Sequence, residues 1–310
     1  MILITGGAGF IGINFVHYLR EKNLAHKILV ADKLTYSANA KDIQKLKDIK
    51  FEIVDIADKA ALEELFKKYY IDSIVNFAAE THVDNSIENC DVFVQSNIVG
   101  TVNLLQLAKK YTVRRFLHVS TDEVFGSIEE GDFNEHSPIA PRNPYSASKA
   151  AAEHFVKSFS NTYGLPTVIV NCSNNYGPYQ HTEKFVARAI DTLRKGGNIP
   201  VYGNGQQVRD WIYVKDCVRA IYEVHIKGRI GERYCIGGDS TITNLDLARL
   251  ILKEMNLSDD RLEFVADRPG HDQRYSTDCS KLKDELGWKA EFTLDQGIKE
   301  TIRWINENRI

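Results

Sequence analysis

The chain has 310 residues, of which 43% are hydrophobic and 26% charged, as is typical of soluble globular domains. That length favours two lobes, or one large domain with an appendage, over a single compact core. The net charge of -3 argues against nucleic acid or anionic membrane as partners, and no apolar stretch approaches the roughly 20 residues that span a bilayer.

The start of the chain and its cysteines indicate a cellular compartment. "MILIT" begins a strand at once, without the basic lead or cleavage site of a signal peptide. The five cysteines are scattered and form no C-x-x-C pair. This pattern suits free thiols in a reducing cytoplasm better than disulfides or a zinc site, so a cytoplasmic location and no metal are predicted.

The first half of the chain alternates apolar β-branched runs with helical patterns. Apolar residues recur at helical spacing in 58–70 and 97–111. The near-continuously apolar runs are typical of strands covered on both faces. Strand–helix alternation of this kind predicts an α/β fold with a doubly wound parallel sheet. The predicted strands are 2–5, 27–32, 51–55, 73–79, 115–121 and 167–172.

A glycine-rich turn joins the first strand to the first helix. In "ILITGGAGFIG", Gly7, Gly9 and Gly12 fit G-x-G-x-x-G, and Gly6, Gly9 and Gly12 equally fit G-x-x-G-x-x-G. Either pattern is weak alone, but the strand before it and the helix after it predict a dinucleotide site. The second strand ends in Asp32, an acid placed to bind ribose hydroxyls and repel a 2′-phosphate. The predicted cofactor is NAD.

Two further charged residues bear on the cofactor prediction. Lys33 follows Asp32 directly and weakens the preference for NAD over NADP. Asp55, which closes the third strand, is expected near the adenine.

"STDEVFG" (120–126) places two carboxylates, Asp122 and Glu123, at the end of the fifth strand. An isolated pair of acids usually lies in a solvated turn, because neither can be buried cheaply unless paired or protonated. Further along, Tyr145 and Lys149 lie four residues apart, on one face of a helix that begins near Asn143. A lysine one turn away should lower the pKa of the tyrosine, so that it can act as a base.

The second half is less regular. The helices predicted at 243–255 and 293–305 open with T-x-x-D and T-x-x-Q, both helix-start signatures. Loops rich in glycine and proline separate them, and no low-complexity linker intervenes. The second lobe is therefore expected to pack closely on the first.

Taken together, the motifs resemble the extended short-chain dehydrogenase/reductase family, and within it the nucleotide-sugar 4,6-dehydratases. The resemblance runs from Met1 to about residue 305, and it rests on "TGGAGFIG", "DKLTYSAN", "FAAETHVDNSI", "STDEVFG", "YSASK", "NCSNNYGPYQHTEK", "QVRDWIYVKD" and "DRPGHDQRY". It implies a Rossmann NAD-binding domain over 1–173, with a returning segment at about 209–230. The remaining 174–208 and 231–310 would form a smaller α/β domain that binds the sugar nucleotide.

The resemblance also implies a reaction and an assembly. The substrate would be dTDP-glucose and the product dTDP-4-keto-6-deoxyglucose. Thr121 would bind the sugar 4-hydroxyl beside Tyr145 and Lys149, with Glu123 as the base at C5 and Asp122 as the acid for the departing 6-hydroxyl. Such enzymes are usually homodimers joined by a four-helix bundle, built here from about 91–111 and 145–163.

The binding residues implied by the resemblance form two groups. Those for the cofactor are Gly6, Gly9, Phe10, Ile11, Gly12, Asp32, Lys33, Leu34, Thr35, Asp55, Ile56, Ala78, Ala79, Glu80, Thr81, Tyr145, Lys149 and Asn175. Those for the substrate are His82, Thr121, Asn174, Lys184, Phe185, Pro200, Val201, Tyr202, Arg209, Asn244, Asp267, Arg268, Pro269, Gly270 and His271. Taken singly, each arginine or lysine fits an exposed solubilising charge. Arg209 is the best candidate for a phosphate ligand, because it precedes the apolar "WIYV".

Some features depart from the family pattern, and alternatives stay open. Phe125 stands where tyrosine is usual, Cys235 where asparagine is usual, and the segment from Thr121 to Tyr145 is short. A UDP-sugar 4-epimerase, a UDP-glucuronate decarboxylase, another nucleotide-sugar 4,6-dehydratase and a silent dinucleotide-binding regulator remain as alternatives. Asp122 counts against the epimerase and the decarboxylase. The choice between thymine and uracil, which differ by one methyl, is left open.

Overall fold

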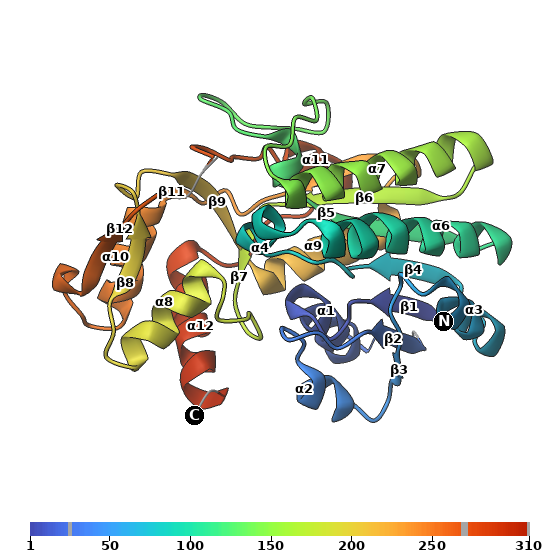
Figure 1. The fold of residues 1–310 in the computed structure, drawn as a ribbon, viewed down its shortest axis with the longest axis horizontal. Helices are drawn as coiled ribbons and strands as arrows, with labels where there is room; N and C mark the ends of the chain where they lie inside the picture. Colours follow the sequence, from blue (N-terminus) through green and yellow to red (C-terminus); the bar gives the residue numbers. More distant parts are fainter. Residues whose placement is uncertain (24–26, 268–271, 309–310) are drawn as a thin grey trace.

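The computed structural model describes residues 1–23, 27–267 and 272–308 (Figure 1). The strands of its large sheet are β1 (Ile2–Thr5), β2 (Ile28–Asp32), β3 (Lys50–Ile53), β4 (Ser73–Asn76), β5 (Arg115–Thr121), β6 (Thr167–Cys172) and β10 (Arg233–Ile236). They pair in parallel in the order β10-β6-β5-β4-β1-β2-β3. This confirms the predicted doubly wound sheet. The order reverses between β1 and β4, which is where such sheets bind ligands beyond the carboxyl ends of their strands.

Helices cover both faces of this sheet. They are α1 (Phe10–Glu21), α2 (Ala40–Gln44), α3 (Lys59–Lys68), α4 (Val83–Glu88), α5 (Asp91–Phe93), the π-helix η1 (Val94–Val99), α6 (Gly100–Lys110), the 3-10 helix η2 (Asp122–Phe125), α7 (Pro144–Tyr163), α9 (Val214–Lys227) and α11 (Ser280–Leu286). Along β1, Ile2 and Ile4 join the core under α1 and α9, whereas Leu3 joins the core under α3, α6 and α7. Burial on both faces explains why these strands are continuously apolar.

A second, smaller lobe lies at one end of the sheet (Figure 1). Its elements are β7 (Asn174–Tyr176), α8 (Phe185–Arg194), β8 (Ile199–Tyr202), β9 (Val208–Tyr213), β11 (Thr241–Thr243), α10 (Asn244–Glu254), the 3-10 helix η3 (Asp259–Arg261), β12 (Leu262–Val265) and α12 (Leu294–Asn308). They form a three-stranded sheet, β11-β9-β7, and a strand pair, β12-β8. The helices bury Leu247, Ile251 and Ile298 around Trp211.

The division between the lobes differs from the expected boundaries at two strands. Residues 233–236, expected in the second domain, form β10, the edge strand that pairs with β6. Residues 208–213, expected mostly in the returning segment, form β9 in the small sheet, although Ile212 still joins α9 in the core of the large sheet. Short apolar runs carry no periodicity that tells which sheet they join, so tertiary pairing decides.

The two lobes are held together by hydrogen bonds beside the crevice. Asn14 Nδ2 donates to the Pro178 carbonyl at 2.9 Å, and Lys184 Nζ donates to the Thr81 carbonyl at 2.8 Å. The Tyr36 hydroxyl donates to Glu183 Oε2 at 2.7 Å. Among the described residues, no helix is long and apolar enough to cross a membrane.

Candidate active site

The glycine turn between β1 and α1 forms a cradle in which backbone approaches backbone. A Cβ on Gly12 would lie 2.3 Å from the Gly6 carbonyl oxygen. Gly6 has a φ of +68°, and a Cβ there would lie 2.5 Å from the Ala78 nitrogen. Helix α1 then begins at Phe10 with no side-chain cap at Gly9, so its first N–H groups point into the crevice. This arrangement fits a pyrophosphate.

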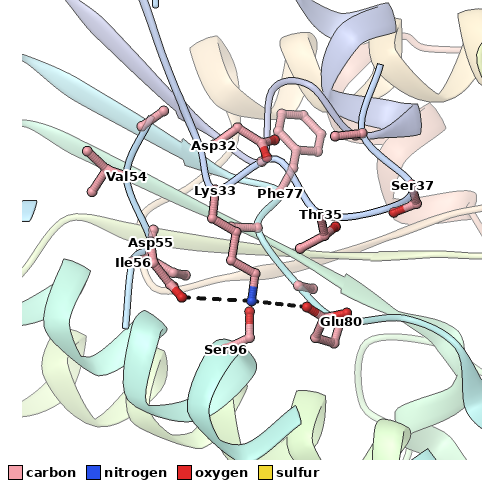
Figure 2. A pocket seen from close by; sticks show the side chains of 16 residues that line it. Asp32, Lys33, Thr35, Ser37, Val54, Asp55, Ile56, Phe77, Glu80 and Ser96 are labelled. Carbon is pink, nitrogen blue, oxygen red and sulfur yellow. Dashed lines mark ion pairs between the residues drawn. The ribbon is translucent and has the colours of Figure 1, made fainter. Parts of the chain in front are cut away.

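A pocket beside this turn, named here the Asp32 pocket, is lined by Gly6, Gly9, Asp32, Lys33, Thr35, Asp55, Ile56, Ala78, Ala79 and Glu80, among others (Figure 2). Asp32 accepts hydrogen bonds from the Ala8 N–H at 2.9 Å and the Leu34 N–H at 2.8 Å, one on each oxygen. Burial raises the pKa of Asp32, and these two bonds oppose the rise. The two hydrogen bonds hold the carboxylate at the rim of the pocket, where it can bind the hydroxyls of a ribose.

The side chain of Lys33 is paired with two carboxylates. Its ammonium lies 3.0 Å from Glu80 Oε1 and 3.9 Å from Asp55 Oδ2, as Figure 2 shows. The loop that carries Glu80 is fixed in turn by Asn97, which bonds the Glu80 N–H at 2.8 Å and its carbonyl at 3.0 Å. A lysine tied to two carboxylates has its charge neutralised locally. The pocket therefore fits NAD better than NADP.

A larger cavity of about 430 Å³, the central cleft, continues from the glycine turn between the two lobes. It is lined by all five predicted catalytic residues, Thr121, Asp122, Glu123, Tyr145 and Lys149. The predicted binding residues that also line it are Gly6, Gly9, Phe10, Ile11, Gly12, Ala79, Thr81, His82, Asn174, Asn175, Lys184, Phe185, Pro200, Tyr202, Arg209 and Asn244. One continuous cleft thus brings together segments from both halves of the sequence.

Some predicted residues lie elsewhere. Val201 is buried in the core of the second lobe, and Leu34 packs against the core of the first. Asp267 accepts a hydrogen bond from Gln207 at 3.1 Å and does not line the cleft. The predictions for Arg268, Pro269, Gly270 and His271 fall outside the described residues.

The two adjacent acids sit in different surroundings. Strand β5 ends at Thr121, and the 3-10 turn η2 buries Asp122 at 1% exposure while Glu123 stays partly exposed. Burial, then the charges of Glu123 and Asp210, raise the pKa of Asp122 well above its usual value. Asp122 Oδ2 has no hydrogen-bond partner within the described part of the chain. These surroundings favour the protonated form of Asp122, and the residue lines the cleft.

Glu123 keeps the properties of an accessible carboxylate. Its Oε2 accepts a hydrogen bond from Asn143 Nδ2 at 3.3 Å, at the residue that caps α7. Asn143 also accepts from the Ser146 N–H at 2.8 Å, so the cap and the carboxylate are positioned together. One acid is buried, with its pKa raised, and the other is partly exposed, and such a difference in surroundings suits paired acid and base roles.

Tyr145 and Lys149 occupy one buried face of α7, as their spacing predicted. Burial and the charge of Glu123 raise the pKa of Tyr145, although a hydrogen bond with Thr121 opposes the rise, so the expected lowering was wrong. Burial lowers the pKa of Lys149 to about 8, and its Nζ donates to the Val119 carbonyl at 2.7 Å. Lys149 is thus charged at neutral pH and held beneath the cleft.

Cations at the far end of the cleft come from the second lobe. Arg209 is 4% exposed, stacks 4.2 Å from the Tyr275 ring and donates to the carbonyls of Val208 and Asp272, both at 2.7 Å. Lys184 precedes α8, and Arg188 follows one turn later on the same wall. Arg188 was missed in the sequence, although its i+4 spacing from Lys184 was a signal.

Other cleft residues were also missed. They are Ser37, Phe77, Val83, Asp84, Val119, Ser120, Cys172, Ser173, Gln180, His181, Glu183 and Trp211. Ser120 stands beside Thr121 in the sequence, and its buried Oγ has no partner within the described ranges. His181 and Glu183 meet Tyr36 from the other lobe, a juxtaposition that no local pattern reveals. In the same described residues, no group of three or more His, Cys, Asp or Glu side chains is placed to hold a metal ion.

The profile of a family described as GDP-mannose 4,6 dehydratase matches residues 3–301. The chain belongs to this family of extended short-chain dehydrogenases/reductases.

Individual relatives and solved structures in this family resemble the chain over nearly its whole length. The chain is 46% identical to a dTDP-glucose 4,6-dehydratase of Haemophilus influenzae, over 98% of this chain and 97% of the relative. It is 42% identical to one of Escherichia coli, over 99% and 94%. The crystal structure of the dTDP-glucose 4,6-dehydratase DesIV of Streptomyces venezuelae, with NAD and TYD bound, has a TM-score of 0.96 at 42% identity and covers 99% of this chain and 97% of that one. A UDP-glucose 4-epimerase of Thermotoga maritima, with UDP-glucose, has a TM-score of 0.93 at 28% identity, over 99% and 98%.

Proposed function

We propose that this protein converts dTDP-glucose to dTDP-4-keto-6-deoxyglucose and water, as an NAD-dependent hydro-lyase. The observation that carries the proposal is the acid pair, Asp122 and Glu123, in one cleft with Thr121, Tyr145 and Lys149. Relatives named for this activity match nearly the whole chain at 42–46% identity. The glycine cradle and the Asp32 pocket fit NAD, and residues 6–12, 32–35, 55–56 and 78–81 would hold it.

NAD, when bound, would supply the oxidant for C4 of the sugar and the reductant for C6, with no net change of the cofactor. In the oxidation, Thr121 binds the 4-hydroxyl and Tyr145 takes its proton. Because burial raises the pKa of Tyr145, this transfer depends on the positive charge of Lys149 beneath the cleft. The resulting 4-ketone makes the C5 hydrogen acidic.

The two acids then divide the elimination of water. Glu123 takes the C5 proton, while Asp122 gives its proton to the 6-hydroxyl, which leaves as water. The buried, proton-holding state of Asp122 suits the acid, and the partly exposed Glu123 suits the base. At the other end of the cleft, Lys184, Arg188 and Arg209 supply positive charge for the diphosphate.

Epimerisation at C4 is the competing activity, since a UDP-glucose 4-epimerase shares the fold at a TM-score of 0.93. An epimerase breaks no bond at C5 or C6, so it has no use for a proton donor and a proton acceptor side by side at the sugar. The fold does not separate the two activities, whereas the acid pair favours the dehydratase.

The test is incubation of the purified protein with dTDP-glucose in heavy water, followed by mass spectrometry. Loss of one water and gain of one deuterium at C5, without net consumption of NAD, supports the proposal. An unchanged mass with inversion at C4 would overturn it in favour of an epimerase. Parallel reactions with UDP-glucose and UDP-glucuronate test the choice of nucleotide and sugar.

We also propose a cytoplasmic homodimer joined by a four-helix bundle of 91–111 and 145–163 from each copy. Helices α6 and α7 lie side by side on one face of the molecule (Figure 1). The segments expose apolar side chains, with Val92 and Tyr163 each 51% exposed and Phe155 41% exposed. The scattered cysteine spacing supports the location. Light scattering should give twice the chain mass, and Phe155→Glu should halve it, whereas Phe264→Glu on the other lobe should not.

A further inference from the structure

Glu153 continues the line of Tyr145 and Lys149 along α7. The three residues are spaced by four, lie on one face of the helix and are 8%, 3% and 1% exposed, respectively. A carboxylate buried to this degree needs partners, and Glu153 has two. Asn171 Nδ2 donates to its Oε1 at 2.7 Å, and the Arg233 guanidinium forms an ion pair with its Oε2. None of the reaction steps above uses this group.

The first partner connects Glu153 to the catalytic strand. Asn171, on β6 and fully buried, uses the same Nδ2 to donate to the Thr121 carbonyl at 2.9 Å. The side-chain amide of Asn171 therefore donates one hydrogen to the Glu153 carboxylate and the other to the Thr121 backbone carbonyl. Thr121 Oγ1 in turn accepts the Glu123 N–H at 3.3 Å. A shift of the Glu153 carboxylate would be transmitted to the turn that carries both acids.

The second connection is electrostatic and runs to Lys149. Burial lowers the pKa of Lys149 to about 8, and the charge of Glu153 is the first contribution that opposes this. Cys172 on β6 and His118 on β5 also face the lysine. A hydrogen bond to a neighbouring thiol and burial raise the pKa of Cys172, and burial lowers the pKa of His118, so both are neutral near pH 7. The charge of Glu153 therefore favours the protonated form of Lys149.

Arg233 completes the arrangement from the edge strand β10. Its guanidinium pairs with Glu153 and lies 5.4 Å from the centre of the Phe125 ring. The arginine balances the charge of Glu153. Removing either partner of such a buried pair leaves the other uncompensated.

We propose that Glu153 is a positioning residue, which holds Thr121 through Asn171 and keeps Lys149 charged, with Arg233 as its counter-ion. The effect of Glu153 on catalysis rests on the proposed dehydratase function. Its effect on the charge of Lys149 does not depend on which sugar reaction the enzyme performs.

The test uses the opposite effects of the two partners on Lys149. Glu153→Gln removes the negative charge, so the pKa of Lys149 should fall and the alkaline limb of kcat/KM should move to lower pH by about one unit. Arg233→Gln leaves Glu153 without its counter-ion, so the limb should move to higher pH. Glu153→Asp keeps the charge and should return the limb toward that of the wild type. A purely structural role would lower stability in both single variants but would not shift the limb in opposite directions.

Two further measurements keep the test decisive. If a single variant folds poorly, Glu153→Gln/Arg233→Gln removes both charges together and should keep the downward shift of the limb. Asp216→Asn is the matched control, because Asp216 is a 1% exposed carboxylate paired with Arg219 on another helix, α9. It should lower stability without moving the limb.

The pKa of Lys149 can also be read without turnover, by NMR titration of lysines labelled with ¹³C at Cε, with the signal assigned by its loss in Lys149→Met. The midpoint should fall in Glu153→Gln and rise in Arg233→Gln. Equal midpoints in both variants and the wild type would overturn the inference. Failure of the wild type to form the 4-keto-6-deoxy sugar would instead overturn the proposed function, and the titration would still decide the role of Glu153.

Discussion

The Asp32 pocket and the catalytic end of the central cleft differ in whether their buried polar groups have hydrogen-bond partners. In the Asp32 pocket, both oxygens of Asp32 already accept backbone N–H groups, and Lys33 is paired with Glu80 and Asp55. At the catalytic end, Asp122 Oδ2 and Ser120 Oγ are buried and have no partner in the part of the chain that is described.

The difference shows how one fold separates binding from reactivity. A binding pocket is rigid when its polar groups are satisfied before the ligand arrives. A reacting group must instead keep an atom free for the substrate, and burial then shifts its protonation state. Four predictions test this contrast, from the largest effect to the smallest.

Glu123→Gln removes the base from the catalytic end while it preserves size and hydrogen bonding. Turnover should fall by about 10²–10⁴-fold, because the amide cannot take the C5 proton. C4 oxidation needs only Thr121, Tyr145 and Lys149, so substrate should still reduce the bound cofactor, seen as near-ultraviolet absorbance. Glu130→Gln, an exposed acid in the following loop, is the control and should turn over normally. Full turnover by Glu123→Gln would remove it from the base role.

Gly12→Ala breaks the cradle on the binding side. The added Cβ would lie 2.3 Å from the Gly6 oxygen and 2.8 Å from the Gly7 Cα, so the turn must shift. Stability should fall by about 1–3 kcal/mol and NAD affinity by at least about tenfold. Within the described ranges, the Cβ of Gly9→Ala would meet the Gly6 oxygen at 3.2 Å and no other atom within 4 Å, so the change should cost little stability yet still weaken NAD binding. Thermal shifts with and without NAD measure both, and wild-type affinity in Gly12→Ala would contradict the cradle.

Asp122→Asn should show how much the buried carboxyl group of Asp122 lowers the free energy of unfolding. The folded pKa of Asp122 lies above its unfolded value, so the folded chain retains a proton that the unfolded chain releases. Wild-type stability therefore falls as pH rises through the unfolded pKa of about 4, and the variant escapes this loss. Near pH 7 the variant should be more stable by about 1 kcal/mol or more, and near pH 4 the two should be alike. Equal urea denaturation curves at both pH values would show that Asp122 is ionised.

Lys33→Ala should have the smallest effect. Its ion pairs are partly exposed, with the lysine side chain at 30%, and such pairs contribute about 0.2–1 kcal/mol. Because Asp32 remains, the variant should still prefer NAD over NADP in a binding titration. A loss of NAD affinity beyond about tenfold would mean that Lys33 contributes more to cofactor binding than a partly exposed charge can.

Much of the architecture follows from local patterns in the sequence. Strands β1, β5 and β6 begin and end where their apolar runs predicted. Thr243 caps α10 by accepting the Asp246 N–H at 3.0 Å, as its T-x-x-D box predicted. Helix α7 begins at Pro144 behind the Asn143 cap, so Tyr145 and Lys149 share a buried face. Such features depend on neighbours a few residues apart, which a sequence displays directly.

The protonation and pairing of the same residues were not predictable in this way. The sequence determined a dinucleotide-binding sheet, an acid pair at a strand end and a tyrosine–lysine helix, because spacing and residue type suffice for these. Only the tertiary structure decided that Asp122 is buried while Glu123 is reachable, that burial raises the pKa of Tyr145, and that Glu80 holds Lys33. It also joined β10 to the large sheet, which brought Arg233 to Glu153. Desolvation and ion pairing depend on residues distant in the chain, so folding must bring them together before either acts.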